Sequence, residues 1–370
     1  MGRWILGKPP GGDRNGVFPV TQVSHVMIAT PYLLYLGHST DPADIKTSRG
    51  LAVFRPEICV GEYRHDDCTL TLDLPRMDFA AARAAGAKTL VLGIANAGGK
   101  LGDALIVDAL AALEAGLDIA SGLHQRLNAE PRLAEAAARL GRKLHDVREP
   151  RPDIPIGNGK PRAGRRLLTV GTDCSVGKMY TTLCLARALE KRGVIADFRA
   201  TGQTGILIAG DGVPLDAVIA DFISGAIEQI SPARSDDGWD LIEGQGSLYH
   251  PSFAGVSMGL IHGAQPEALV LCHDPVRPHM RGLPHYDLPG IGECIEANLR
   301  AARLTSANVR MVGIALNTSA MPEAEAAALC ARTEAEFGLP TSDPYRFGVE
   351  TILDRLLGVE AAAPAAVQTA

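Results

Sequence analysis

A glycine-bounded loop between an apolar run and a helical pattern is the segment of this sequence best suited to chemistry. Residues 171–179 read G-T-D-C-S-V-G-K-M, after the apolar run 167–170 and before helical periodicity that begins at residue 181. Glycines let backbone N–H groups close around a phosphate, while the helix N-terminus and a lysine supply positive charge. The pattern predicts a phosphate-binding loop made of Gly171, Thr172, Asp173, Cys174, Ser175, Val176, Gly177, Lys178 and Met179.

This loop departs from the common pattern G-x-x-x-x-G-K-[ST] in two ways. Five residues separate Gly171 from Gly177, and Met179 stands where a Ser or Thr hydroxyl would hold Mg²⁺. The capacity to bind phosphate is kept, whereas metal binding is in doubt. We therefore expect a phosphate-bearing cofactor in preference to a magnesium-nucleotide hydrolase.

A carboxylate at the end of a second apolar run is a candidate catalytic residue. Glu243 ends the run in W-D-L-I-E-G-Q-G (239–246), and a glycine turn follows it. A carboxylate at a strand end beside a phosphate loop can reach a metal or accept a proton. A cap on the next helix is the alternative. We interpret Glu243 as an active-site residue.

The segment C-H-D-P-V-R-P-H-M-R-G-L-P-H-Y-D (272–287) follows another apolar run and combines prolines, histidines and arginines. A rigid, cationic loop at a strand end lies where parallel sheets bind ligands. Arg277 and Arg281 are suited to binding a carboxylate. The residues suited to proton transfer are His273, Asp274, His279 and His285. The histidine spacing does not favour a metal site, and a structural loop is the alternative.

Two further features were weighed for a role in the site. Gln203 and Thr204, in T-G-Q-T-G (201–205), follow a strand and could line a substrate, although a structural turn explains them nearly as well. Cys174 could carry an acyl group near a helix N-terminus. Packing is the expected role for Cys174, because no histidine is placed by sequence to activate it.

Two series of alternating strands and helices must position these residues. Such alternation is typical of βαβ units and a parallel sheet covered on both faces. The predicted fold class is α/β, with a Rossmann-like parallel sheet followed by a doubly wound domain of the P-loop NTPase type. The predicted boundaries are an N-terminal domain at 1–150, a linker rich in proline and glycine at 151–165, a second domain at 166–358 and a disordered tail at 359–370.

The elements expected within these domains follow from hydrophobic periodicity. The expected strands are 25–29, 58–63, 89–95, 117–121, 144–147, 167–170, 194–199, 241–243, 269–273 and 311–317. The expected helices are 79–85, 102–115, 131–140, 178–191, 216–230, 290–303, 323–337 and 349–357.

Composition restricts the class of partner. The 370 residues exceed the size at which one core stops growing, and 46% are hydrophobic. A net charge of −6 argues against nucleic acid and anionic membranes, which leaves small molecules as partners. Seven cysteines without a C-x-x-C pair indicate reduced thiols and a cytoplasmic location, and we expect no zinc site and a homo-oligomer, such as a dimer.

Several motifs together resemble one family. G-T-D-C-S-V-G-K (171–178) and D-x-x-E-G-x-G (240–246) resemble dethiobiotin synthetase and its P-loop relatives, whose first motif ends in Lys-Thr. The chain as a whole resembles the D-glutamate N-acetyltransferases, long catalogued as a domain of unknown function. The likeness runs from about residue 46 to 357, and its motifs occur in family order. It rests on Met179, K-T-S-R-G-L (46–51), G-G-K-L (98–101), A-G-L-D-I-A-S-G-L-H (115–124), D-V-R-E-P (146–150), T-G-Q-T-G, the D-x-x-x-x-D-F helix (216–222), H-D-P-V-R-P-H-M-R-G (273–282) and G-I-A-L-N-T (313–318).

The resemblance implies transfer of an acetyl group from acetyl-CoA to the amine of D-glutamate or a related D-amino acid. The amine must then lose a proton, and Glu243 is the first candidate for the base and His279 the second. Coenzyme A carries phosphates that need not be hydrolysed, which agrees with a loop that lacks the hydroxyl for Mg²⁺. Two other functions stay open on the residues alone. One is an ATP-dependent carboxylate ligase or kinase, and the other is a non-catalytic protein that binds coenzyme A or a nucleotide.

Overall fold

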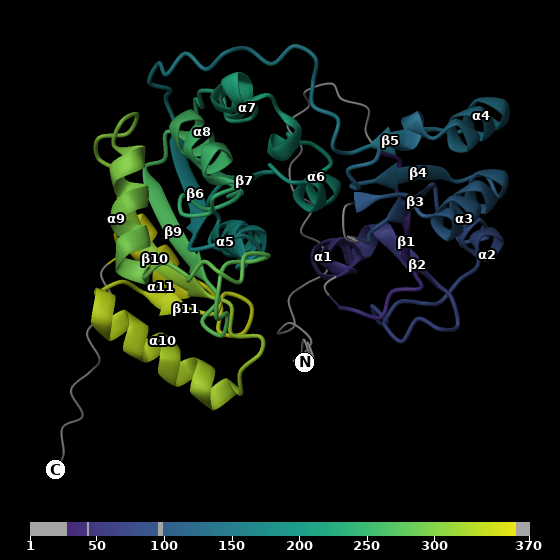
Figure 1. Cartoon of the computed structure of the whole chain (residues 1–370). Coiled ribbons are helices and arrows are strands. Elements are labelled where there is room, and N and C mark those ends of the chain that lie inside the picture. The colour runs from purple at the N-terminus through teal and green to yellow at the C-terminus, as the bar shows by residue number, and fades with distance from the viewer. Residues whose placement is uncertain (1–27, 43, 95–98, 360–370) are drawn as a thin grey trace. The chain divides into compact units, whose positions relative to one another are not determined.

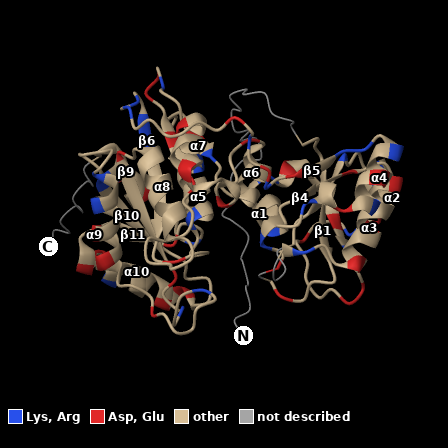
Figure 2. Cartoon of the chain, turned by 45° about the horizontal axis from the view of Figure 1, so that its top comes forward, with Lys and Arg blue, Asp and Glu red and all other residues tan. Residues whose placement is uncertain are grey.

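The computed structural model describes residues 28–42, 44–94 and 99–359, and the chain divides into two compact units (Figure 1). We call residues 28–153 with Ala200–Val218 the N-terminal unit, and Ile154–Arg199 with 219–359 the C-terminal unit. Ala200–Val218 therefore packs with the N-terminal unit although it follows the phosphate loop in sequence. Acidic and basic residues are interspersed over the helices of both units (Figure 2).

The N-terminal unit is built on a parallel sheet in the order β2-β1-β3-β4-β5. The strands are β1 (Tyr32–Gly37), β2 (Cys59–Arg64), β3 (Thr89–Leu92), β4 (Asp118–Ser121) and β5 (Leu144–Asp146). The helices are α1 (Lys46–Phe54), α2 (Phe79–Ala84), α3 (Asp103–Glu114), α4 (Pro131–Leu140) and α6 (Gln203–Ala209). β1 and β3 are buried throughout, as expected of central strands covered on both faces. Helices α2, α3 and α4 pack on one face, and α1 and α6 pack together on the other (Figure 1).

The C-terminal unit is built on a second parallel sheet, in the order β11-β10-β9-β6-β8-β7. The strands are β6 (Arg165–Gly171), β7 (Ala196–Arg199), β8 (Trp239–Ile242), β9 (Ala268–His273), β10 (Arg310–Leu316) and β11 (Thr341–Ser342). The helices are α5 (Lys178–Lys191), α7 (Ile223–Ile230), α8 (Ala254–Ala264), α9 (Ile291–Ala302), α10 (Glu323–Phe337) and α11 (Glu350–Leu357). Helices α5 and α11 cover one face, and α7 to α10 cover the other.

The strand order brings the two loops of greatest chemical interest to one place. β6 pairs with β8 on one side and with β9 on the other, so β6 and β9 form the point where the order of the sheet reverses. Ligands of open α/β sheets bind outside the carboxyl ends of the strands at such a point. The loop after β6 is the predicted phosphate loop, and the loop after β9 is the segment 272–287.

The predicted fold class is confirmed, because both sheets are parallel and both are covered by helices on their two faces. Helices α4, α5 and α10 have the predicted bounds. The sequence offered clear end signals for α4, which begins with Pro131 and ends before Gly141 at φ +64°. The domain boundaries predicted from sequence stay a prediction, and the tail from residue 360 lies outside the described residues.

Some predicted elements were wrong. The expected helix 216–230 is two 3₁₀ turns, Leu215–Ala217 and Ala220–Phe222, followed by α7, because the chain leaves one unit for the other between Val218 and Ile219. The expected strand 25–29 falls largely outside the described residues, and the strand lies at β1, after Pro31. Helices α1, α6 and α8 and the short strand β11 were missed.

Candidate functional site

The loop after β6 has the backbone geometry that its glycines predict. Gly177 adopts φ +101°, a conformation that residues with a side chain rarely adopt, and it precedes the first residue of α5. Gly171 ends β6 where a Cβ atom would lie 2.8 Å from Val176 Cγ2 and 3.0 Å from Lys178 Nζ. One glycine is therefore required by the turn and the other by the close approach of the lysine.

Lys178 is buried at the base of this loop, with 6% of its surface exposed. Its Nζ donates a hydrogen bond of 2.7 Å to the backbone oxygen of Asp173. Burial lowers the pKa of Lys178, and the neighbouring Cys174, Cys272 and Asp173 act in the opposite direction. An anion bound in the loop would favour the charged form of the lysine, since a nearby opposite charge offsets the cost of burial.

Asp173 joins the loop after β6 to the loop after β9. The residue is fully buried, and its carboxylate accepts three hydrogen bonds. Oδ1 accepts from Cys174 N at 2.6 Å, and Oδ2 accepts from Arg277 Nη1 at 2.7 Å and from Arg281 N at 2.8 Å. A buried carboxylate with charged and backbone donors is a strong link between two loops that are distant in sequence.

Arg277 binds backbone oxygens of the phosphate loop from the neighbouring segment. Its Nη1 also donates to Cys174 O at 2.6 Å, and its Nη2 donates to Ser175 O at 3.1 Å and to Asp274 Oδ2 at 3.3 Å. Both terminal nitrogens of the guanidinium are thus bound to the protein. The partners of Arg277 include the carboxylates of Asp173 and Asp274, and its binding of a substrate carboxylate stays a prediction.

In Arg281 the backbone, and not the side chain, is bound to neighbouring residues. Its backbone is held, since N donates to Asp173 Oδ2 and O accepts a hydrogen bond of 3.4 Å from His250 Nε2. Its side chain is exposed, and within the residues that the structure describes the guanidinium makes no hydrogen bond or ion pair. Arg281 therefore presents an unpaired cation beside the phosphate loop.

The predicted catalytic residues differ in how they are held. His279 Nδ1 lies 3.0 Å from Met280 O, and a carbonyl can only accept, so in the neutral ring Nδ1 carries the proton and Nε2 keeps its lone pair. Asp274 is bound to Arg277. Glu243 follows β8 directly and is buried, with its backbone N bonded to Arg199 O. In this tautomer His279 Nε2 can accept a proton, and the catalytic roles of the three residues stay predictions.

His250 is a site residue that the sequence analysis missed. Asp173, Cys174 and His250 each offer a metal-ligating atom, and these atoms lie within 4.8 Å of one another. His250 Nδ1 accepts a hydrogen bond from Ser252 N at 3.2 Å, so Nε2 carries the proton that it donates to Arg281 O. That proton blocks the nitrogen that a metal would need. A histidine in the turn after β8 was the signal that could have identified this residue.

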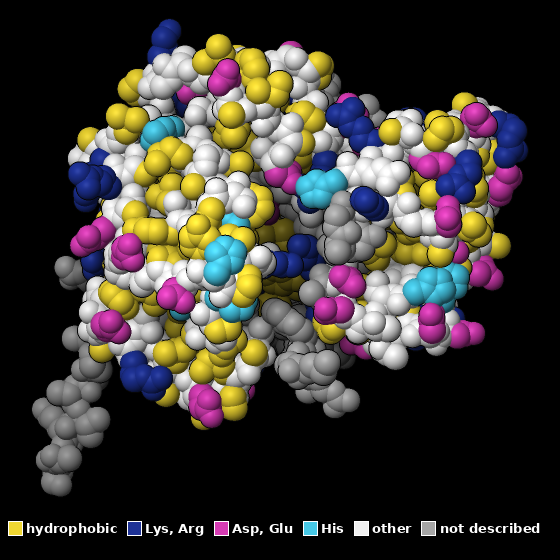
Figure 3. Space-filling model, viewed as in Figure 1, with side chains coloured by type: hydrophobic (Ala, Val, Ile, Leu, Met, Phe, Trp, Pro, Cys, Tyr) yellow, Lys and Arg dark blue, Asp and Glu magenta, His cyan; other side chains and the backbone are white. Residues whose placement is uncertain are grey.

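Two other neighbours complete the loop's surroundings. Thr172 Oγ1 lies 3.0 Å from His273 Nδ1, and burial lowers the pKa of His273, which favours its neutral form. Burial raises the pKa of the Cys174 thiol, so the thiol form is favoured at neutral pH. Histidine side chains also gather on the visible face of the C-terminal unit in Figure 3.

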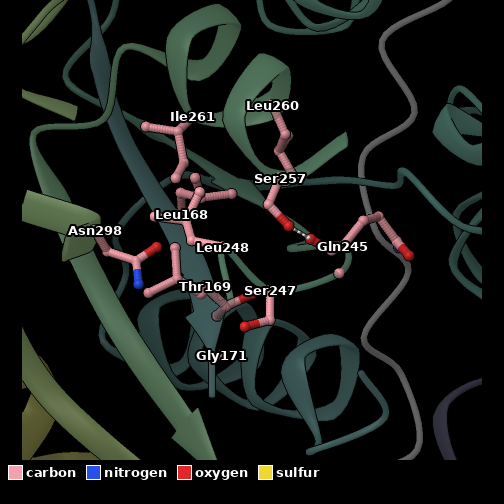
Figure 4. Close-up of a pocket in the computed structure, with 12 residues that line it drawn as sticks. Leu168, Thr169, Gly171, Gln245, Ser247, Leu248, Ser257, Leu260, Ile261 and Asn298 are labelled. Carbon is pink, nitrogen blue, oxygen red and sulfur yellow. Dashed lines mark hydrogen bonds between the residues drawn. The ribbon is translucent and has the colours of Figure 1, made fainter. Parts of the chain in front are cut away.

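A small pocket adjoins the start of the loop on the α8 side of β6 (Figure 4). Ser257 Oγ donates to Gln245 O at 2.8 Å, and Asn298 of α9 stands at the opposite side. Its wall is mainly apolar and comes from β6, the turn after β8 and α8. The lining residues are Leu168, Thr169, Val170, Gly171, Gln245, Gly246, Ser247, Leu248, Ser257, Leu260, Ile261 and Asn298.

Gln203 and Thr204 belong to the N-terminal unit, unlike the other predicted site residues. They open α6, and Thr204 Oγ1 lies 2.8 Å from Thr47 Oγ1 of α1. Gln203 packs so closely on Gly122 that a Cβ atom there would lie 2.6 Å from Gln203 Cγ. Their role in binding a substrate stays a prediction.

Comparisons with known proteins agree with this architecture. Residues 155–353 match the P-loop domain of a family described as a domain of unknown function, DUF1611_C, and residues 59–150 match its Rossmann-like domain, DUF1611_N. A crystal structure at 2.30 Å of a DUF1611 family protein from Anabaena variabilis superposes with a TM-score of 0.82. That protein is 35% identical, and the match covers 89% of this chain and 100% of the other.

Two curated relatives carry a functional name. The D-glutamate N-acetyltransferase of Tritonibacter scottomollicae is 51% identical over 333 residues, and that of a Pseudoalteromonas species is 48% identical over 331 residues. Each match covers 90% of this chain and 100% of the relative. Among the described residues, no helix is long and apolar enough to cross a bilayer. The resemblance noted in the sequence is confirmed, and the chain belongs to the DUF1611 family, with a Rossmann-like N-terminal and a P-loop C-terminal domain.

Proposed function

We propose that this protein is a D-glutamate N-acetyltransferase that uses acetyl-CoA as its donor. The proposal is supported by two relatives of that name, each about half identical to this chain. Each match covers the whole length of the relative and 90% of this chain. The observation that carries the choice of donor is the loop at 171–179, which keeps its glycines and its buried lysine but has Met179 in place of a hydroxyl for Mg²⁺. Such a loop suits a phosphate group that is bound and not cleaved.

The phosphate loop would hold one phosphate of coenzyme A. The N-terminus of α5 would offer its first backbone N–H groups to an anion, whereas the amides of Thr172 and Cys174 are already bonded within the protein. Lys178 lies at the base of the loop. Arg277 keeps the loop in shape from outside. The role of these residues is to bind and orient the donor, which needs no metal at position 179.

The chemical step needs the acceptor amine without its extra proton. His279 Nε2 is the proposed base, because its lone pair is free in the tautomer that Met280 O imposes. The amine nitrogen then attacks the thioester carbonyl carbon, an N–C bond forms, and the C–S bond breaks. The new amide nitrogen loses its second proton, and coenzyme A leaves as a thiol after its sulfur takes up that proton. Glu243 is the second candidate for the base, and Asp274 acts through Arg277.

The acceptor's side-chain or α-carboxylate would pair with Arg281. Its guanidinium is exposed and unpaired within the described residues, whereas Arg277 is already bound. A charge-assisted bond between guanidinium and carboxylate is planar and two-pronged, which gives both affinity and orientation.

The experiment that tests this function is thiol release from acetyl-CoA in the presence of D-glutamate, L-glutamate and other D-amino acids. We expect release that depends on the acceptor and is highest with D-glutamate. Folded protein that releases no thiol above buffer would contradict the proposal. Formation of ADP that requires ATP and an added acid would instead favour a ligase or kinase of the dethiobiotin synthetase type.

Two properties of the whole protein belong to the same proposal. All seven cysteines are free, which supports a reducing, cytoplasmic location. We expect a homodimer, and light scattering of the purified chain measures its mass directly.

A further inference from the structure

We infer that Asp173 and His250 are positioning residues that fix the backbone of Arg281, so that its side chain can bind the carboxylate of the acceptor. The inference rests on the proposed function, because it assigns parts within the same site. It goes beyond that function by separating the residue that binds the acceptor from the two buried residues that hold it in place.

Asp173 holds the amide side of Arg281. The 2.8 Å bond from Arg281 N to Asp173 Oδ2 is made inside the protein, since Asp173 has no exposed surface. The same oxygen binds Arg277 Nη1 at 2.7 Å, so its place is fixed by a charged partner as well. Removing an acceptor of this kind would leave buried donors unsatisfied, which is costly.

His250 holds the carbonyl side of Arg281. The ring is 2% exposed, and its Nε2 lies 3.4 Å from Arg281 O and 4.0 Å from Asp173 Oδ1. The hydrogen bond from Ser252 N to Nδ1 fixes the tautomer, so that Nε2 is the donor. Two buried polar side chains, one from each neighbouring loop, therefore hold the peptide groups on both sides of one exposed residue.

This arrangement couples the two substrates through Asp173. The residue lies inside the phosphate loop, where its backbone oxygen accepts from Lys178 and its carboxylate accepts from the amide of Cys174. Its other oxygen sets the position of Arg281. The loop that would bind the donor thus also determines where the unpaired guanidinium stands, and a pre-organised binding group costs less entropy to use.

The test compares Asp173→Asn and Arg281→Ala, alone and together, with KM measured for each substrate. Asparagine keeps one oxygen but loses the charge that holds Arg277 and the Arg281 amide. We expect Asp173→Asn to raise the KM for D-glutamate about tenfold. In the presence of Arg281→Ala it should raise that KM no further, because the guanidinium that the held backbone presents is gone.

A second pair of variants keeps the test decisive if Asp173→Asn does not fold, as judged by circular dichroism. His250→Gln retains an N–H donor for Arg281 O, whereas His250→Phe fills the space without one. We expect His250→Phe to raise the KM for D-glutamate severalfold and His250→Gln to stay close to the wild-type value. Calorimetric titration with D-glutamate provides the same comparison without turnover.

Three results would overturn the inference. They are an unchanged KM for D-glutamate in Asp173→Asn, an equal increase with and without Arg281, and equal behaviour of His250→Phe and His250→Gln. Failure of the proposed function looks different, because the wild-type protein would then neither bind nor acetylate D-glutamate. That outcome would overturn the proposed function, and this inference with it.

Discussion

Two buried carboxylates, Asp173 in the C-terminal unit and Asp108 in the N-terminal unit, accept three hydrogen bonds each but serve different ends. Asp108 lies on the buried side of α3 and accepts from Tyr35 Oη at 2.6 Å, His65 Nε2 at 2.7 Å and Tyr63 Oη at 3.3 Å. Its partners come from β1, β2 and the residue just after β2. They are side chains that lie in the core, as Tyr35 does, or at its edge, as Tyr63 and His65 do. Asp173 binds two backbone amides and one arginine, all in loops at strand ends.

The difference shows what distinguishes a structural carboxylate from one that organises a site. Burial raises the pKa of Tyr63 to about 12, with the charge of Asp108 acting in the same direction, so the phenol stays protonated and keeps donating. The network around Asp108 thus stabilises the unit. Around Asp173 the donors belong to loops, and one of them, Arg281, has an exposed side chain that is unpaired among the residues that the structure describes. Changes near Asp173 should therefore alter kinetics, and changes near Asp108 should alter stability.

The largest effect is expected for His279→Gln. Removing a general base costs a factor of about 10² to 10⁴ in rate, and glutamine cannot accept the proton. The kcat for acetyl transfer at saturating substrates is the quantity to measure, together with the melting temperature, which should change little. His285→Gln is the matched control, because His285 is exposed in the same segment and its ring lies at a tilt against that of Tyr286. A kcat unchanged in His279→Gln would transfer the role of base to Glu243.

Asp108→Asn should lower the free energy of unfolding by about 3 kcal/mol, because the amide replaces one acceptor oxygen by an N–H donor and cannot satisfy the three groups that donate to Asp108. Urea denaturation of the two proteins measures this difference. The KM values of the folded variant should match those of the wild type. Asp103→Asn is the control on the same helix, where the side chain is exposed and pairs only with Arg132. A loss of activity in Asp108→Asn without a loss of stability would erase the contrast with Asp173.

The phosphate loop could be predicted from sequence because its signals are local. The strand, the glycines and the helix are adjacent in the chain, so periodicity and residue type specify them together. Gly171, Gly177 and Lys178 take the conformations and contacts that the motif requires. The parallel sheets could be predicted for a similar reason, since the alternation of strands and helices leaves few other topologies.

The contacts that organise the site could not be predicted, because they join residues far apart in sequence. Arg277 and Asp173 are separated by 104 positions, and Arg281 and His250 by 31. The residues next to Arg277 and Arg281 in sequence do not indicate that Arg277 binds the phosphate loop, whereas the side chain of Arg281 is unpaired among the described residues. Membership of Ala200–Val218 in the N-terminal unit is equally a matter of packing, which also explains why the helix expected over 216–230 is broken.

Arg281→Ala should raise the KM for D-glutamate by roughly ten- to a hundredfold, equivalent to ~1.5–3 kcal/mol for a hydrogen bond to a charged group. Arg281→Lys should recover only part of this loss, because an ammonium lacks the planar fork. Arg277→Ala is the informative comparison, since it should raise the KM for acetyl-CoA by loosening the phosphate loop. Initial rates with each substrate varied in turn separate the KM for D-glutamate from the KM for acetyl-CoA. If Arg281→Ala raised only the KM for acetyl-CoA and Arg277→Ala only that for D-glutamate, the roles of the two arginines would be reversed.

The smallest effect concerns the stability of the protein without ligand. Burial lowers the pKa of Lys178 below the ordinary 10.5, so the charged lysine costs the folded state stability at neutral pH. This cost is relieved as the pH rises from the folded-state pKa toward 10.5, where the unfolded chain also loses its proton.

Lys178→Met removes the charge together with one hydrogen bond to Asp173 O, so we expect it to stabilise the free protein at pH 7 by less than about 1 kcal/mol. The gain in the free energy of unfolding should shrink between pH 7 and pH 10. Lys191→Met, at the exposed end of α5, should show no such gain. Urea denaturation at both pH values measures it. A less stable Lys178→Met at pH 7 would mean that the lysine stabilises its loop even without an anion, and Lys178 would then resemble Asp108 more than Asp173.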